Sequence, residues 1–205
     1  PDIYHQDFYG QCNAYARPDN PLFIPETGRN PKSVSHLLGA LGIYHNMIGF
    51  SPFGIDDMLS APLYVQMNQA ERDALKIDLN WDQCLPENTE YFRRAYDLVR
   101  EIWDFYVKKR DQVIGFSRRS ENEDGVVIPM GKYDILLKYP QNDESKAGTG
   151  GFIIPIDEFS FYIVGCNVSI SFMVAGNVAG YTEPVGMWEG RFEKGEFIPG
   201  RKQNG

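Results

Sequence analysis

The two parts of the chain carry different secondary-structure signals. Residues 1–111 alternate short apolar runs, typical of buried strands, with longer stretches that repeat apolar residues at helical spacing. Residues 112–205 carry only strand signals, separated by frequent turn residues. Because such a change marks a candidate domain boundary, we predict an α/β part over residues 1–111 and an all-β part over residues 112–205.

The first part has the strand, helix, strand order that builds parallel sheets. Residues 21–26 and 47–54 are apolar runs that predict two buried strands. Between them, Asn30 can cap a helix with Pro31 at its first position. A second helix is predicted over residues 89–110 by one continuous apolar face. Two short strands cannot bury such helices alone, so we expect this part to belong to a larger α/β sheet or barrel.

The second part alternates apolar and polar residues as antiparallel strands do. Two strand faces are expected, Tyr133, Ile135, Leu137 and Tyr139 on one strand and Val168, Ile170, Phe172 and Val174 on another. Turns are predicted at residues 157–158, 166–167 and 194–195, and the polar residues 141–151 predict a flexible surface loop. We predict an antiparallel β-sandwich that packs partly against the helix of residues 89–110.

Charge and hydropathy argue against two classes of partner. The chain has 20 Lys and Arg against 28 Asp and Glu, a net charge of −8, and its basic clusters are residues 108–110 and 118–119. Nucleic acid is therefore not an expected partner. Apolar runs fall short of the ~20 residues of a membrane span. Cys12, Cys84 and Cys166 are too far apart for a zinc spacing or a disulfide framework, and they indicate no compartment.

The start of the chain suggests a longer parent protein. The sequence opens at Pro1 without Met or a signal peptide, and residues 1–4 resemble the end of a strand. We therefore expect a fragment whose N-terminal part is missing.

Glu26 is the sharpest chemical feature of the sequence. It ends a predicted buried strand and precedes a turn that contains Gly28. In (β/α)₈ enzymes the catalytic groups lie at the C-terminal ends of the strands, and a carboxylate there can attack an anomeric carbon. The alternative is a solvated Glu that closes a strand, and spacing alone favours that alternative.

Several ordered blocks resemble clan A glycoside hydrolases, more narrowly the bacterial β-galactosidase-like enzymes of families 35 and 42. Residues 2–4, 20–29 and 48–56 are similar to their last three barrel strands, and residues 157–159, 164–168, 189–192 and 199–201 to their C-terminal β domain. The resemblance implies the C-terminal part of a (β/α)₈ TIM barrel, about strands 6–8, followed by a β-sandwich. It also implies a carbohydrate substrate and, as a partner, the N-terminal remainder of the same barrel.

The resemblance implies that Glu26 is the nucleophile of a retaining enzyme. The acid/base carboxyl of such enzymes ends strand four, which would lie upstream of Pro1. Since retention needs both carboxyl groups about 5–5.5 Å apart, we expect the isolated chain to be inactive.

Four further residues are candidate substrate-binding residues. Tyr4 could hydrogen-bond the nucleophile or pack in the barrel, and Phe53 could stack on a sugar or belong to the core. Asp56, with Asp57, could hydrogen-bond sugar hydroxyls. Arg29 could bind substrate, although pairing with an acid is favoured.

Cofactor motifs are absent from the sequence, and we expect neither a cofactor nor a metal. There is no P-loop, dinucleotide fingerprint or G-x-S-x-G. His5 and Asp7 lack a second His at a suitable place for an iron site, and Cys12 with His5 has no supporting motif. The alternative function is a non-catalytic carbohydrate-binding or structural β module that carries a remnant of a barrel.

Overall fold

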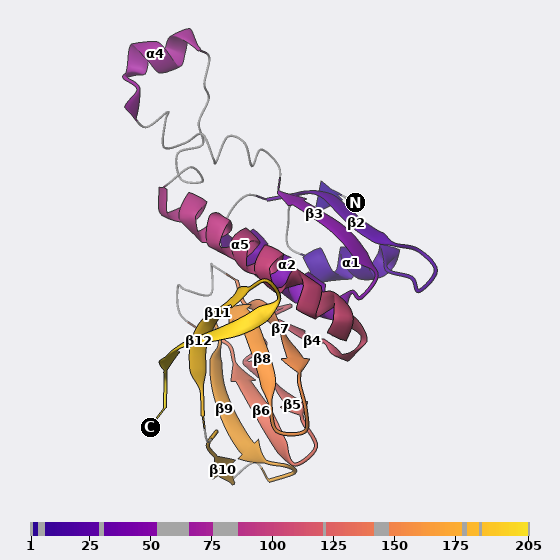
Figure 1. Ribbon diagram of the computed structural model, residues 1–205. Coiled ribbons are helices and arrows are strands. Elements are labelled where there is room, and N and C mark those ends of the chain that lie inside the picture. Colours follow the sequence, from indigo (N-terminus) through magenta and orange to yellow (C-terminus); the bar gives the residue numbers. More distant parts are fainter. Residues whose placement is uncertain are drawn as a thin grey trace. The chain divides into compact units, whose positions relative to one another are not determined.

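The computed structural model describes residues 2–3, 7–28, 31–52, 66–75, 86–120, 122–141, 148–177, 180–184 and 186–204 (Figure 1). The chain divides into two compact units. Unit 1 comprises residues 1–34 and 46–96, and unit 2 comprises residues 35–45 and 97–205. The functional division between residues 111 and 112 stays a prediction.

The elements follow the expected change from mixed to all-β structure. Unit 1 contains β1 (Asp2–Ile3), α1 (Phe8–Tyr15), β2 (Leu22–Thr27), β3 (Met47–Pro52) and α4 (Gln69–Ala74). Helices α2 (Pro31–Ile43) and α5 (Pro86–Lys109) each begin in unit 1 and end in unit 2. Unit 2 contains the 3₁₀ turn η1 (Arg110–Gln112) and the strands β4 (Ile114–Ser117), β5 (Gly125–Pro129), β6 (Tyr133–Lys138), β7 (Gly150–Pro155), β8 (Phe161–Cys166), β9 (Ser169–Val174), β10 (Tyr181–Thr182), β11 (Trp188–Glu193) and β12 (Glu196–Lys202).

The strands of unit 1 form a parallel sheet in chain order, β1-β2-β3. Its carboxyl ends are level, because Thr27 is the Cα partner of both Ile3 and Pro52. The predicted strands are confirmed over residues 22–26 and 47–52, as is their parallel arrangement, and residues 53–54 of the second predicted strand lie outside the described residues. The prediction that both strands are buried is wrong for one face: Leu22, Ile24 and Met47 are buried, whereas Phe23 is 50% and Ile48 is 67% exposed.

Helix α1 lies in a segment that the sequence analysis left without secondary structure. The Asp7 side chain caps it by accepting a hydrogen bond from the Gly10 backbone N–H at 2.9 Å. Phe8, Tyr9 and Cys12 are buried, and the Phe8 ring lies 6.2 Å from the ring of Phe50 on β3. The helix thus depends on its cap and on contacts with distant residues, neither of which produces a long periodic pattern.

Two antiparallel sheets form the body of unit 2, with strand orders β10-β9-β6-β5 and β4-β7-β8 (Figure 1). Their shared core contains Ile135 and Leu137 from β6 and Phe116 and Ile153 from the other sheet. The register pairs Ile135 with Phe172 and Leu137 with Ile170, which confirms that these residues share a face. This arrangement is compatible with a β-sandwich.

The other face of the β4-β7-β8 sheet is covered by aromatic side chains of α5 and of the β11-β12 hairpin. The ring of Phe105 on α5 lies 5.3 Å from that of Tyr162 on β8, and the Tyr106 ring lies 5.7 Å from Phe152 on β7. Phe192 on β11 lies 5.1 Å from Tyr162. The predicted packing of the β part against this helix is confirmed.

The polar segment of residues 141–151 is not a surface loop throughout. Its last residues begin β7, and Thr149, Gly150 and Gly151 are buried. Gln141 is held by hydrogen bonds from its Nε2 to the carbonyls of Tyr139 and Glu123. A polar, glycine-rich sequence is typical of a loop, whereas Gly150 and Gly151 here allow close backbone packing.

The predicted turns are confirmed where residues adopt left-handed backbone conformations. Asn167 has φ 56° between β8 and β9, and Lys194 and Gly195 have φ 53° and 81° between β11 and β12. Among the helices that the structure describes, none is both long and apolar enough to cross a membrane.

Candidate functional site

Glu26 lies at the edge where the three parallel strands of unit 1 end. It is the penultimate residue of β2, and its Cα partner on β1 is Asp2. Since Ile3, Thr27 and Pro52 are level and end their strands, Glu26 stands next to the shared carboxyl edge of the sheet. This is the edge at which parallel α/β folds bind ligands and hold catalytic groups.

The local irregularity of β2 sets the surroundings of the Glu26 side chain. In a regular strand Glu26 would share the buried face of Leu22 and Ile24. The pairing of β2 with β3 shifts between Ile24 and Thr27, and Thr27 is buried, so the alternation of the faces changes over these residues. Glu26 remains half-buried, neither sealed in the core nor fully in solvent.

The segment after Glu26 is hydrogen-bonded to the first turn of α2. The Ser33 hydroxyl, which is buried, donates a hydrogen bond to the carbonyl of Gly28. This bond fixes the path of the chain two residues beyond Glu26, and a strand-end carboxylate needs such support to hold one orientation.

The other predicted site residues lie outside the described residues. These are Tyr4, Arg29, Phe53 and Asp56, together with Asp57. In the sequence, Tyr4 directly follows β1 and Phe53 directly follows β3. Their roles stay predictions.

The alternative nucleophile and the metal site gain no support from the described residues. Cys12 is completely buried in α1, and burial raises the pKa of its thiol to about 12. A thiol with this pKa is protonated at neutral pH and is a poor nucleophile. Within the part of the chain that the structure describes, no group of three or more His, Cys, Asp or Glu side chains could hold a metal ion.

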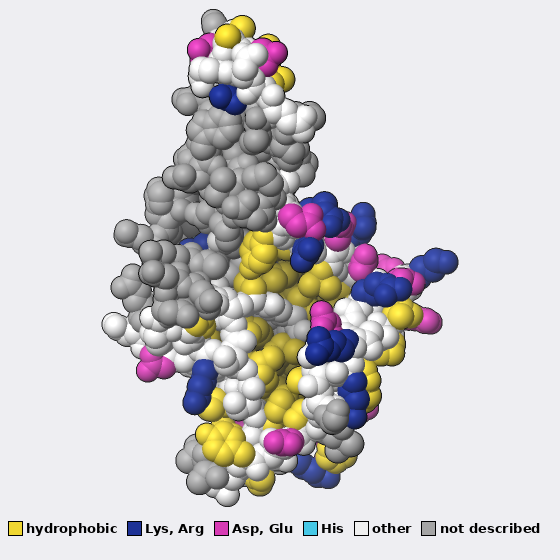
Figure 2. All heavy atoms as spheres, turned by 90° about the vertical axis from the view of Figure 1, so that its left-hand side faces the viewer, with side chains coloured by type: hydrophobic (Ala, Val, Ile, Leu, Met, Phe, Trp, Pro, Cys, Tyr) yellow, Lys and Arg dark blue, Asp and Glu magenta, His cyan; other side chains and the backbone are white. Residues whose placement is uncertain are grey.

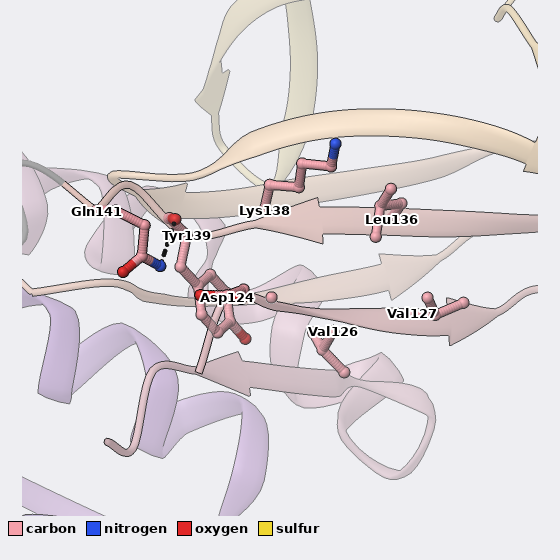
Figure 3. Close-up of a pocket in the computed structure, with 8 residues that line it drawn as sticks. Asp124, Val126, Val127, Leu136, Lys138, Tyr139 and Gln141 are labelled. Atoms are coloured by element: carbon pink, nitrogen blue, oxygen red, sulfur yellow. Dashed lines mark hydrogen bonds between the residues drawn. The ribbon is translucent and has the colours of Figure 1, made fainter. Parts of the chain in front are cut away.

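A second candidate is a hollow of about 500 Å³ on the β5-β6 hairpin (Figure 3). Val127 and Leu136 are Cα partners that form part of its apolar floor, and Asp124, Lys138 and Gln141 are polar lining residues. Asp124 supplies the one carboxyl group among its described lining residues. A single carboxyl cannot provide both catalytic groups of a glycosidase, so this hollow is suited to binding alone.

The third candidate is Trp188 on β11, an aromatic side chain that is 50% exposed. The adjoining chain is firmly held: Asn204 Oδ1 accepts from the Met187 N–H at 2.6 Å, and Gln203 N–H donates to the Met187 carbonyl at 2.8 Å. A half-exposed indole next to this held backbone could stack on the apolar face of a sugar. Neither this residue nor the hollow can be predicted from the sequence pattern, because neither has a motif and both depend on strand register.

The surface carries charges of both signs. On the face drawn in Figure 2, the described Lys and Arg side chains are scattered among Asp and Glu, and hydrophobic side chains reach the surface between them. The expected absence of a nucleic-acid partner stays a prediction.

Comparisons with known proteins give one family. No curated protein matches the chain. A family model described as "Domain of unknown function (DUF5597)" matches residues 92–205, which include the last 18 of the 24 residues of α5 and all strands from β4 to β12. Because this match spans more than half of the chain, the chain belongs to the DUF5597 family.

Proposed function

We propose that the chain is the C-terminal part of a retaining, β-galactosidase-like glycoside hydrolase, with Glu26 as the nucleophile. The observation that carries the proposal is the position of Glu26, half-buried beside the level carboxyl ends of three parallel strands. The ordered sequence blocks that resemble clan A enzymes favour this function over other uses of a strand-end carboxylate.

The proposed reaction has two steps. The Glu26 carboxylate attacks the anomeric carbon and forms a glycosyl-enzyme ester while the leaving-group oxygen takes a proton from the acid/base carboxyl. Water, deprotonated by the same acid/base group, then displaces Glu26 and releases the sugar with retained configuration. The acid/base group belongs to the N-terminal remainder of the barrel, which is the partner that the reaction requires.

The exposure of Phe23 on the unit 1 sheet supports a barrel that continues beyond this chain. Phe23, half-exposed on β2, lies over Gly49 of β3, where an added Cβ would come within 2.4 Å of the ring. The interior of a (β/α)₈ barrel is filled by such side chains from neighbouring strands. In the proposal, β1, β2 and β3 are about strands 6–8, and Phe23 packs against the remainder of the barrel.

Substitution of Glu26 tests the proposal in the full-length parent protein. Glu26→Gln keeps the size of the side chain and removes the charge, so no ester can form, and we expect kcat on an aryl β-galactoside to fall by several orders of magnitude. The far-ultraviolet circular dichroism spectrum should not change, because a strand-end side chain that is half-exposed adds little stability. Glu183→Gln, an exposed carboxylate after β10, is the matched control and should keep full turnover. Turnover of Glu26→Gln near that of the control would contradict the proposal.

The second candidate function is a non-catalytic carbohydrate-binding module, and the half-exposed Trp188 is the observation that favours it. Affinity electrophoresis in gels that contain galactan distinguishes the two functions. A binding module would be retarded, and Trp188→Ala would abolish the retardation. Trp103→Ala is the control, since Trp103 is 42% exposed on α5 but stacked on Tyr106.

A further inference from the structure

Two glycines of unit 2 bring a helix and a strand into direct backbone contact. A Cβ atom added to Gly42 on α2 would lie 2.4 Å from the Cα of Gly115 on β4. A Cβ added to Gly115 would lie 2.4 Å from the carbonyl carbon of Gly42 and 2.6 Å from the nitrogen of Ile43. Packed interiors leave no room for atoms at such distances, so both positions require glycine.

A third glycine makes a similar contact further along the helix. A Cβ added to Gly150 on β7 would lie 2.2 Å from the carbonyl oxygen of Ser35. The backbone of α2 is thus in contact with two neighbouring strands of one sheet, β7 near Ser35 and β4 near Gly42. Contact at both places defines the line along which the helix crosses the sheet.

Polar contacts fix the end of the same helix. The Tyr106 hydroxyl on α5 donates a hydrogen bond of 2.7 Å to the Leu41 carbonyl, and burial raises the pKa of Tyr106, which keeps the phenol a neutral donor. An imidazole nitrogen of His45, just after the helix, lies 3.1 Å from the Val113 carbonyl oxygen. The surface that α2 contacts therefore supplies directional partners as well as shape.

The family match contains one side of each of these contacts and leaves out the other side. Gly115, Gly150 and Tyr106 lie inside residues 92–205, which match DUF5597, whereas residues 35–45 lie outside the match. Yet residues 35–45 belong to the same compact unit as residues 97–205. The matched region is therefore one part of a folded unit whose remaining part comes from earlier in the chain.

We propose that Gly115, Gly150, Phe152 and Tyr106 form a helix-docking face, and that its partner is a glycine-bearing helix from the part of the protein that precedes the DUF5597 region. In this chain the partner is residues 35–45. The Phe152 side chain is fully buried. It lies against α2, because a Cβ added to Gly42 would come within 2.7 Å of the Phe152 Cβ. Without the helix this apolar side chain would be exposed to water. The DUF5597 region then acts as a receptor for residues 35–45 and is not a module that folds alone. The inference holds whether or not Glu26 is catalytic.

Hydrogen exchange of the whole 205-residue chain, read by mass spectrometry, tests this docking. In Gly115→Ala the new methyl group would displace the helix, and we expect peptides that cover residues 36–43 to exchange at least about tenfold faster, together with β4 and β7. Peptides of β2 and β3 should exchange at the wild-type rate, since Gly115 contacts no residue of those strands among its nearest neighbours. Gly200→Ala is the control, because its Cβ would meet a single carbonyl oxygen at 3.1 Å. That variant should leave residues 36–43 unchanged.

Two results would overturn the proposal. One is unchanged exchange at residues 36–43 in Gly115→Ala while β4 and β7 accelerate. The other is a result in the wild-type protein: peptides of residues 36–43 exchange in the same opening event as peptides of β2 and β3. If Gly115→Ala does not fold, Tyr106→Phe replaces it, because this change removes only the hydroxyl that binds the Leu41 carbonyl. Faster exchange confined to the last turn of α2 supports docking, and wild-type exchange there contradicts it.

Discussion

At the scale of single residues, burial decides which ionisable groups are available for chemistry. Cys12 and Tyr139 are both buried, and burial raises the pKa of each to about 12. Glu90 is the opposite case, because hydrogen bonds from Arg93 and Arg94 on the surface of α5 lower its pKa to about 2. Glu26 is half-buried and is the penultimate residue of β2, beside the shared carboxyl edge of the unit 1 sheet. Location in the fold therefore separates Glu26 from these structural groups.

The raised pKa of Tyr139 predicts a loss of stability at alkaline pH. The phenol has an ordinary pKa of about 10 in the unfolded chain and about 12 in the folded chain. Between these values the folded state binds more protons than the unfolded state, so the free energy of unfolding falls as the pH rises above about 10. Urea unfolding curves from pH 8 to pH 11.5 measure this slope.

The same experiment has an internal comparison. Tyr139→Phe removes the titrating group, so its free energy of unfolding should fall less steeply above pH 10 than that of the wild type. Tyr181→Phe, at an exposed tyrosine, should keep the wild-type slope. Equal slopes for all three proteins would show that ionisation of Tyr139 is not coupled to unfolding.

At the scale of elements, helices and strands could be predicted from the sequence wherever their pattern lies in neighbouring residues. The strands β2 and β3 and the helices α2 and α5 all follow from neighbouring residues. Helix α1 was missed because it is 8 residues long, contains Gly10, and depends on its cap and burial. The start of β7 was missed because Gly150 is placed by a contact with Ser35, far away in sequence.

The candidate site could likewise be predicted from the sequence only where it depends on neighbouring residues. The strand end at Glu26 is visible in the sequence because the apolar run stops there. The level ends at Ile3, Thr27 and Pro52 needed the sheet register, which joins segments that are distant in the chain. The hollow on β5-β6 and the exposure of Trp188 also depend on register and on long-range packing.

Helix α5 allows a prediction about the packing of a whole element. Phe105 contacts Tyr162 and Phe192, with ring centroids 5.3 and 6.0 Å apart. Because Phe105 is half-buried, Phe105→Ala should lower the free energy of unfolding by about 2 kcal/mol, less than the ~3–5 kcal/mol of a fully buried Phe. Val107→Ala, at a small and largely exposed side chain of the same helix, should cost less than about 1 kcal/mol. Equal losses in urea unfolding would contradict this packing of α5.

At the scale of the whole molecule, the two compact units are joined by two helices. Helices α2 and α5 each begin in unit 1 and end in unit 2, so no single cut in the sequence separates the units. The DUF5597 match begins within α5, at residue 92. The change in sequence composition near residue 111 therefore locates the start of the all-β segment. The compact unit that contains this segment also includes residues 35–45.

The central claim is that Glu26 is the nucleophile of a retaining glycosidase. The direct measurement is to inactivate the full-length parent protein with a 2-deoxy-2-fluoro-galactoside, digest it, and locate the covalent sugar by mass spectrometry. The account predicts one glycosyl ester, on the peptide that contains Glu26, and none in Glu26→Gln. A glycosyl ester on another carboxylate, or full turnover without any label at Glu26, would contradict it.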